Sequence, residues 1–174
     1  GNVWIGGEVP GIITKQHISY LPDTTFFPKW MKVSKLFDFF QDFYNDFDRA
    51  KAKEMLQRLG IKESMKLGHM SKGTLEKTQL VLTMSRDASL FCLDEPIGGV
   101  DPATRDYILQ TIINNYSENA TVLISTHLIA DIENTLDDVI FLQNGQVRLN
   151  STVDEIRAKE GQSVDSLFRE VFRC

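Results

Sequence analysis

Two adjacent carboxylates, Asp94 and Glu95, directly follow the apolar run formed by residues 90–93. Four consecutive apolar residues are typical of a strand that is buried on both faces of a parallel sheet. Ligands of open α/β sheets gather at the carboxyl ends of such strands. Because successive strand residues point to opposite faces, one acid could hold a hydrated Mg²⁺ while the other faces a reacting water. Two solvated acids at the start of a loop would give the same pattern.

A second candidate site lies upstream, where Ser71, Lys72, Gly73 and Thr74 begin a predicted helix that runs to about Arg86. Ser71 is a favourable N-cap, and Gly73 allows another group to approach the backbone closely. The N–H groups at such a helix start bind phosphate well. Taken alone, Ser71 could equally be an ordinary cap.

The order of these features resembles the signature helix, Walker B strand and D-loop of ABC-type ATPases, which follow one another in the same way. The resemblance covers nearly the whole chain. The matching residues are Ser71, Gly73, Asp94, Glu95, Pro96, Gly99, Asp101 and Pro102. The chain departs from the family at Lys72 and Thr74, which replace a Gly and a Gln. The resemblance implies an α/β fold of the P-loop NTPase kind, with a mostly parallel sheet, flanking helices and an α-helical subdomain.

The resemblance also implies roles for individual residues. In the family, the position of Asp94 holds Mg²⁺ through water and that of Glu95 is the general base. His127, in the sequence Ser-Thr-His after a predicted strand at residues 121–125, matches the histidine that contacts the γ-phosphate. ATP and Mg²⁺ are the implied cofactors, and phosphoryl transfer needs mainly positioning and charge neutralisation.

Four further residues are implied to bind nucleotide: Ser71, Lys72, Gly73 and Asp101. In the family, two such domains meet head to tail. The signature residues would therefore complete the ATP site of the opposite subunit. Lys72 would add a positive charge facing that phosphate.

Asp23 stands where the family has the glutamine of its Q-loop, after a strand candidate at residues 18–21 and Pro22. A carboxylate could reach Mg²⁺ through water, since oxygen ligands suit that ion. An ionised carboxylate cannot donate a hydrogen bond as glutamine does. A turn aspartate with no metal role is the alternative interpretation.

A P-loop is missing from the sequence, which has no G-x-x-x-x-G-K-[ST] run. By the resemblance, the P-loop belongs N-terminal to Gly1. We therefore expect this chain to be a truncated ATPase domain that binds ATP weakly or not at all.

The resemblance divides the chain into two parts. Residues 1–30 and 89–174 are expected to form an incomplete ATPase core lobe, and residues 31–88 a helical subdomain that ends in the signature helix. Near the N-terminus, the resemblance implies an edge hairpin at residues 2–5 and Gly6-Gly7. Asn144-Gly145, between alternating segments, predicts a second hairpin.

Aromatic residues dominate a helix predicted at residues 33–45. One stripe has helical spacing and is expected to be core: Phe37, Phe40, Tyr44 and Phe47. A second line consists of Phe39 and Phe43. The alternative for one of these lines is an exposed docking surface. In the family, a groove near this region receives the coupling helix of a membrane subunit.

Composition limits the remaining possibilities. With 174 residues, 42% hydrophobic and 25% charged, the chain is long and apolar enough for a globular core. A net charge of −5 argues against a nucleic-acid-binding surface, so no nucleic-acid partner is expected. No apolar run approaches the ~18 residues of a membrane span, and two cysteines are too few for a disulfide framework. We expect a cytoplasmic protein.

The function that these observations favour is the ATP-binding subunit of an ABC transporter. Its partners would be a second nucleotide-binding domain and a transmembrane permease at the inner face of the membrane. The Pro-Asp form of the Q-loop resembles exporter-type subunits. Two alternatives stay open. One is an ABC ATPase without a transport role, of the ribosome-acting or DNA-repair type, and the other is a catalytically silent ABC subunit. Asp23, Lys72 and Thr74 favour the silent subunit, whereas Glu95 and His127 oppose it.

Overall fold

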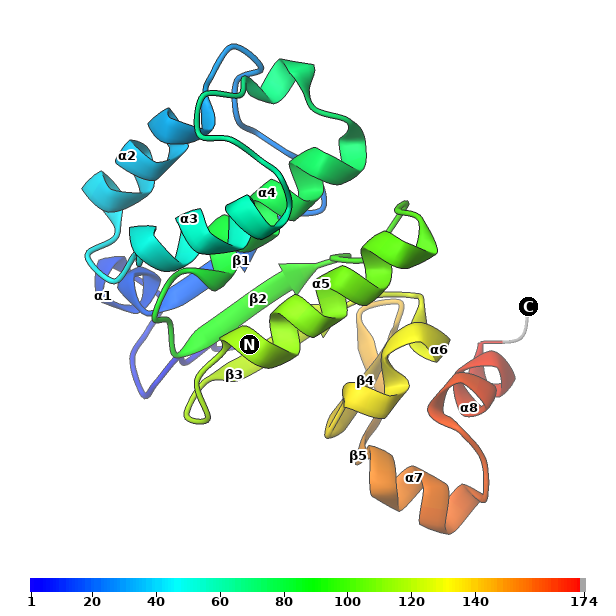
Figure 1. Ribbon diagram of the computed structural model, residues 1–174. Helices are drawn as coiled ribbons and strands as arrows, with labels where there is room; N and C mark the ends of the chain where they lie inside the picture. The colour runs from blue at the N-terminus through cyan, green and yellow to red at the C-terminus, as the bar shows by residue number, and fades with distance from the viewer. Residues whose placement is uncertain (173–174) are drawn as a thin grey trace. The chain divides into compact units, whose positions relative to one another are not determined.

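The computed structural model describes residues 1–172 and divides the chain into two compact units, Gly1–Thr126 and His127–Cys174 (Figure 1). Each unit is described by itself below. The lobes expected from the sequence divide the chain at other points and stay a prediction. No helix among residues 1–172 has both the length and the apolar character that a membrane span requires.

A parallel three-stranded sheet lies at the centre of the first unit, in the order β1-β2-β3. The strands are β1 (Ile18–Leu21), β2 (Leu90–Asp94) and β3 (Thr121–Ser125), at the places predicted. In the register of the sheet, Tyr20 lies beside Cys92 and Cys92 beside Leu123. The parallel pairing brings the carboxyl ends of all three strands to one edge of the sheet.

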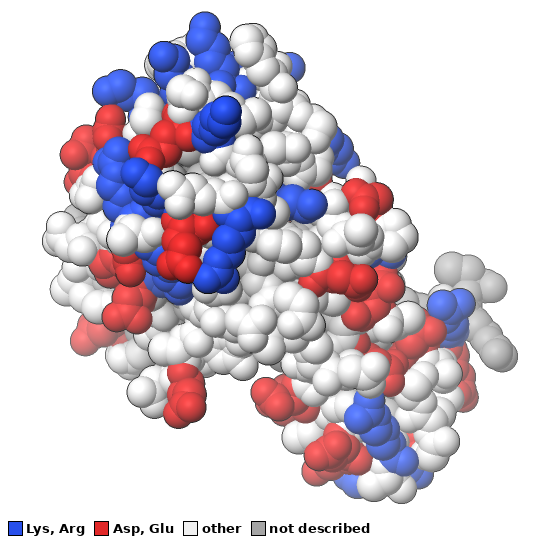
Figure 2. Space-filling view, viewed as in Figure 1, with Lys and Arg blue, Asp and Glu red and all other residues white. Residues whose placement is uncertain are grey.

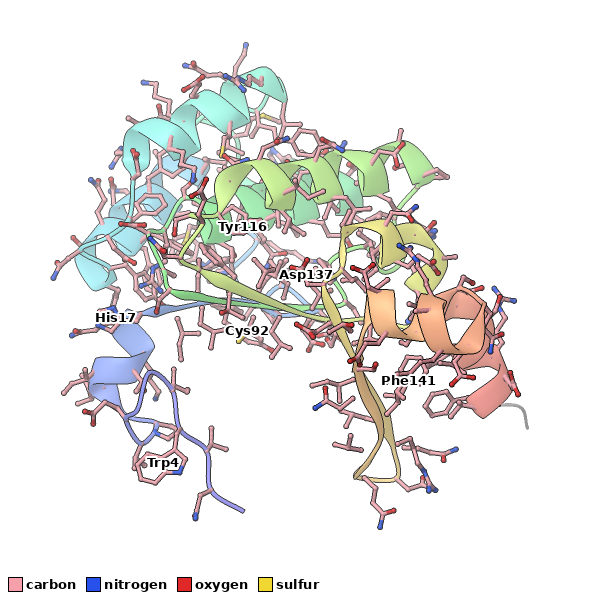
Figure 3. The ribbon with its side chains drawn as sticks, turned by 90° about the horizontal axis from the view of Figure 1, so that it is seen from below. Trp4, His17, Cys92, Tyr116, Asp137 and Phe141 are labelled. Atoms are coloured by element: carbon pink, nitrogen blue, oxygen red, sulfur yellow. The ribbon has the colours of Figure 1, made fainter. Side chains whose placement is uncertain are left out.

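The two faces of this sheet differ in burial. Phe91 and Leu93 are 1% and 2% exposed, whereas Tyr20 and Leu123 on the opposite face are 58% and 56% exposed. In Figure 3 the sheet is seen nearly edge-on, with helices on one side and Cys92 directed to the other. In β2 itself, Leu90 and Cys92 on the second face are only partly buried. The expectation that β2 is buried on both faces therefore holds fully for one face only, the face that helices of this unit cover.

Three helices of the first unit begin at residues whose polar side chains cap them. The side chain of Asp48 accepts a hydrogen bond from the N–H of Lys51 at 2.9 Å, and Ser71 and Asp101 cap the next two long helices in the same way. Pro102 occupies the first turn behind Asp101, where its missing N–H is harmless. The helical elements are α1 (Ile12–Gln16), α2 (Val33–Phe43), α3 (Arg49–Arg58), η1 (Leu67–His69), α4 (Lys72–Met84) and α5 (Pro102–Asn115).

A separate hydrophobic cluster holds α2, α3 and α4 together. It includes Phe37, which is fully buried, and Phe47, which is 7% exposed, so the first aromatic stripe is core as expected. Burying a side chain of this kind contributes about 1.5–3 kcal/mol. Phe39 and Phe43 are 38% and 68% exposed, so the second aromatic line remains at the surface. Figure 2 shows Lys and Arg concentrated over this helical part of the unit.

The second unit is a hairpin covered by helices. Its elements are α6 (Ile129–Ile132), η2 (Glu133–Thr135), β4 (Asp138–Gln143), β5 (Gln146–Thr152), α7 (Val153–Glu160) and α8 (Val164–Val171). Asn144 and Gly145 both have positive φ, as the predicted hairpin turn requires. The ring of Phe141 lies 5.4 Å from that of Phe168 on α8, within the core of the unit (Figure 3).

The N-terminal hairpin is smaller than predicted. Residues 2–5 do not form a strand, and the turn is closed by one isolated bridge between Ile5 and Glu8. Two paired residues with no further strand beside them are too few to make a stable ladder. The short helix α1, which follows this turn, was not predicted either.

Candidate functional site

Asp94 ends β2 between hydroxyl groups of the two neighbouring strands. Ser125 is its partner in the register of β3, and the Oγ of Ser125 donates a hydrogen bond to Oδ1 of Asp94. On the other side, Tyr20 of β1 projects from the same face of the sheet. Partial loss of hydration, then the charges of Asp94 and Asp23 and a hydrogen bond to Asp94, raise the pKa of the Tyr20 hydroxyl. Residues of three strand ends therefore meet at Asp94.

Glu95 adopts a backbone conformation that is unusual for its residue type. Its φ of +46° lies in the left-handed region, which costs a residue with a side chain about 1–2 kcal/mol. Hydrogen bonds hold it there. Its N–H donates to the carbonyl of Ser125 at 2.9 Å, and its own carbonyl accepts from the N–H of Gly98 at 3.0 Å. Thr126 Oγ1 donates to Glu95 Oε2 at 3.1 Å, which fixes the carboxylate as well as the backbone.

The acids at this edge suit Mg²⁺ held partly by water. Among residues 1–172, no three His, Cys, Asp or Glu side chains gather as a ready metal cluster. Mg²⁺ usually takes one or two protein carboxylates and fills its other positions with water and phosphate oxygens. Asp94 is a carboxylate of this kind, and the charges of Asp94 and Asp23 both act on the Tyr20 hydroxyl.

The start of α4 lies against the loop that follows β2. Ser71 caps the helix by accepting from the N–H of Thr74 at 3.2 Å. Nζ of Lys72 is 3.7 Å from Oε1 of Glu76 and 2.7 Å from the point where a Cβ on Gly99 would lie. A side chain at position 99 would therefore have to displace the ammonium group of Lys72.

Asp101 and Gly73 come together through Thr104. The carboxylate of Asp101 accepts from the N–H of Thr104 at 3.0 Å and from its hydroxyl at 2.7 Å, and these bonds lower the pKa of Asp101. The same Thr104 hydroxyl lies 3.8 Å from the point where a Cβ on Gly73 would be. Three of the four predicted nucleotide-binding residues, Lys72, Gly73 and Asp101, are thus joined through the loop and first turn of α5.

His127 follows β3 by two residues and is exposed. It is the first residue of the second unit. Its proximity to Asp94 and Glu95 therefore stays a prediction.

Sequence reasoning assigned no role to four residues of this site: Tyr20, Glu76, Thr104 and Ser125. It did expect Thr126, which follows the strand at residues 121–125, to lie near Asp94 and Glu95. The polar residue that ends the strand at residues 121–125 was a signal for Ser125, and the i, i+4 spacing from Lys72 was a signal for Glu76. The contributions of Tyr20 and Thr104 depend on strand register and helix packing.

Comparison with known proteins shows the family. The family model described as "AAA domain, putative AbiEii toxin, Type IV TA system" matches residues 12–130. The chain is 32% identical over 145 residues to the ABC transporter ATP-binding protein YtrB of Bacillus subtilis, covering 82% of this chain and 49% of that protein. It is 33% identical over 106 residues to EcsA of the same organism, an ABC-type transporter ATP-binding protein, covering 59% of this chain and 43% of that one.

A solved structure gives the same result for the fold. The structure described as the ATP-binding subunit of an ABC transporter superposes with a TM-score of 0.85 at 25% identity, covering 99% of this chain and 77% of that one. The chain spans about half the length of the curated relatives it matches. It therefore belongs to the AAA-domain family of the matching model, and its fold is that of ABC transporter ATP-binding domains.

Proposed function

We propose that this chain is part of an ATP-binding subunit that couples ATP hydrolysis to transport through a membrane permease. The observation that carries the proposal is the edge of the parallel sheet, where Ser125 and Thr126 hold the carboxylates of Asp94 and Glu95 in different places. Two acids with separate supports can serve two roles. The similarity to ABC transporter ATP-binding proteins supports the same conclusion.

In this proposal Asp94 binds Mg²⁺ through water, with Asp23 as a further oxygen donor. A bound Mg²⁺ would neutralise charge on the phosphates of ATP. Glu95 is the general base, because its carboxylate is anchored by Thr126 and its backbone by the carbonyl of Ser125. His127 stabilises the γ-phosphate. These groups supply the positioning and charge neutralisation that phosphoryl transfer requires.

A second nucleotide-binding domain would complete the reaction site. The start of α4 offers the N–H groups of a capped helix, the exposed ammonium of Lys72 and the small residue Gly73. We propose that these groups and Ser71 bind the triphosphate held by the opposing subunit, with Asp101 at the same interface. ATP would then close a head-to-tail dimer, and hydrolysis would open it.

The exposed aromatic line offers a surface for the permease. The tilted rings of Phe39 and Phe43 lie with their centroids 4.6 Å apart, and Phe27 and Phe26 continue the line beside Phe39. Phe26 and Phe43 are each 68% exposed. An apolar helix of the permease would bury these rings, which would place the subunit on the inner face of the membrane. The form of the loop at Pro22-Asp23 supports export as the direction.

The absence of a P-loop sets an expectation for this chain alone. Without the backbone cradle and the lysine of that motif, the triphosphate loses its main ligands. We expect ATP affinity weaker than micromolar and no turnover. Calorimetric titration of ATP into this chain measures that affinity directly, and micromolar binding would contradict the expectation.

The decisive experiment is Glu95→Gln in the full-length protein. The variant should bind ATP and Mg²⁺ like the parent but lose hydrolysis, because glutamine cannot accept the proton of the attacking water. Glu118→Gln, at an exposed position beyond α5, is the matched control and should hydrolyse ATP normally. Hydrolysis retained by Glu95→Gln would exclude Glu95 as the base. A parent protein that binds ATP but never hydrolyses it would instead be a silent subunit.

A further inference from the structure

Lys72 contacts two parts of its own chain. It lies in the first turn of α4, and its Nζ is 3.7 Å from Oε1 of Glu76 one turn further on. The same Nζ lies against Gly99 in the loop after β2, 2.7 Å from where a Cβ would be. Because Gly99 has a φ of +69° and no side chain, the ammonium group can reach the loop backbone closely. Lys72 therefore bridges the signature helix and the D-loop of one subunit.

Lys72 stabilises the negative charge of Glu76. Its side chain is only 21% exposed, and Oε2 is buried without a hydrogen-bond partner among residues 1–172. Burial raises the pKa of this carboxyl, and the ammonium of Lys72 opposes that shift. A half-buried carboxylate with one unsatisfied oxygen is unfavourable unless a cation stays close to it.

The loop under Lys72 leads back to Glu95. Gly98 precedes Gly99, and its N–H donates to the carbonyl of Glu95 at 3.0 Å. A Cβ on Gly98 would lie 3.6 Å from Oε2 of Glu95. The residue that Lys72 approaches, Gly99, is therefore adjacent to Gly98, which helps to position Glu95.

We propose that Lys72 alternates between two positions. Before the dimer closes, Lys72 contacts Glu76 and the D-loop of its own subunit. After closure, it contacts the triphosphate on the opposing subunit. Glu76 is then a positioning residue, which competes with the phosphate for Lys72 and sets the ATP concentration at which the subunits pair. The inference rests on the proposed head-to-tail dimer. ATP shifts the equilibrium between open and closed dimer only by the difference between its affinities for the two states. The free energy needed to release Lys72 from Glu76 reduces that difference.

The test is ATP-dependent dimer formation by the full-length protein in the Glu95→Gln background, which prevents turnover. Light scattering measures the ATP concentration for half-maximal pairing in the presence of Mg²⁺. Glu76→Gln keeps the size of the side chain and removes its charge. It should lower that concentration about threefold, the effect of losing one partly exposed ion pair. No shift would overturn the inference.

A double-mutant cycle separates competition for Lys72 from a general effect of charge. Lys72→Met keeps the length of the side chain without its charge, and in this background Glu76→Gln should leave the ATP concentration unchanged. A threefold shift that persists with Met at position 72 would overturn the inference. Glu54→Gln is the matched control, since Glu54 also pairs with a cation four residues on, Arg58. This control should not shift pairing.

ATP-dependent pairing of the Glu95→Gln protein without further substitutions separates a failure of this inference from a failure of the proposed function. If the Glu95→Gln protein never pairs with ATP, the proposed dimer fails, and the inference with it. If that protein pairs and Glu76→Gln changes nothing, only the role of Glu76 fails.

Discussion

Replacing Arg86 should destabilise the first unit more than any surface substitution. The side chain of Arg86 is 2% exposed, and its Nε and Nη2 each donate to the carboxylate of Asp46 at 2.9 Å. The remaining donors reach the backbone carbonyls of Gln16 and Ile18. The guanidinium also lies 3.8 Å from the centroid of the Tyr44 ring. One side chain thus joins the end of α4, the start of β1 and the loop between α2 and α3.

The size of the effect follows from what Arg86→Met would leave behind. Asp46, whose side chain is 24% exposed, would keep its charge without a partner. Breaking a buried ion pair in this way costs about 3–5 kcal/mol. Two unpaired carbonyls would add to this cost by about 1 kcal/mol or more each, whereas water reaching Asp46 would reduce it. We therefore expect a loss of about 3–5 kcal/mol in the free energy of unfolding.

Urea-induced unfolding followed by circular dichroism measures this loss. Arg58→Met is the control, because Arg58 and Glu54 form an ion pair whose side chains are 74% and 63% exposed. Such a pair contributes at most about 1 kcal/mol. Arg86→Lys should fall between the two, since lysine keeps the charge but cannot bind a carboxylate through two parallel bonds. A loss below about 1 kcal/mol for Arg86→Met would refute the reasoning.

Three further predictions concern single side chains of the first unit. Burial raises the pKa of Glu76, so its ionisation opposes folding, and Glu76→Gln should raise the melting temperature at pH 7. That gain should disappear as the pH falls below the ordinary pKa of glutamate, and an equal gain at every pH would contradict it. Phe43→Ser removes a ring that is 68% exposed, so it should weaken co-purification with the permease while leaving the melting temperature within a degree or two. Ser125→Ala removes the hydroxyl that donates to Asp94, and in the full-length protein it should lower turnover about tenfold and raise the Mg²⁺ requirement; Thr121→Ala, in the same strand, should do neither.

Local rules predicted most of the elements because their signals lie within a few residues of each element. Ser71 and Asp101 cap helices through bonds to N–H groups three residues on, so their roles are readable from adjacent sequence. The apolar run at residues 90–93 and the Asn144-Gly145 turn are local signals of the same kind. The i, i+3, i+7 spacing likewise identified Phe37 as core before any packing was known.

The remaining features depend on contacts between distant segments. The sequence pattern predicts only that Arg86 ends a helix. Its hydrogen-bond partners Asp46 and Gln16 lie 40 and 70 residues away in the sequence. Which face of β2 is buried depends on which helices cover the sheet. A run of four apolar residues does not predict which face those helices cover. The contact between Lys72 and Gly99 could not be predicted from the sequence for a similar reason. The start of α4 approaches this loop only when α4 and α5 pack together.

The loop from Glu95 to Asp101 connects the residue proposed as general base to a residue proposed to lie at the dimer interface. At one end, Glu95 is held in a left-handed conformation by bonds to β3 and to Gly98. At the other end, Asp101 caps α5 and anchors the loop through Thr104, which also faces the signature helix. Gly99, which the ammonium group of Lys72 approaches, lies between these two anchored ends. A movement of the loop backbone at Gly99 would therefore act on the residues that support Glu95 and on the start of α5.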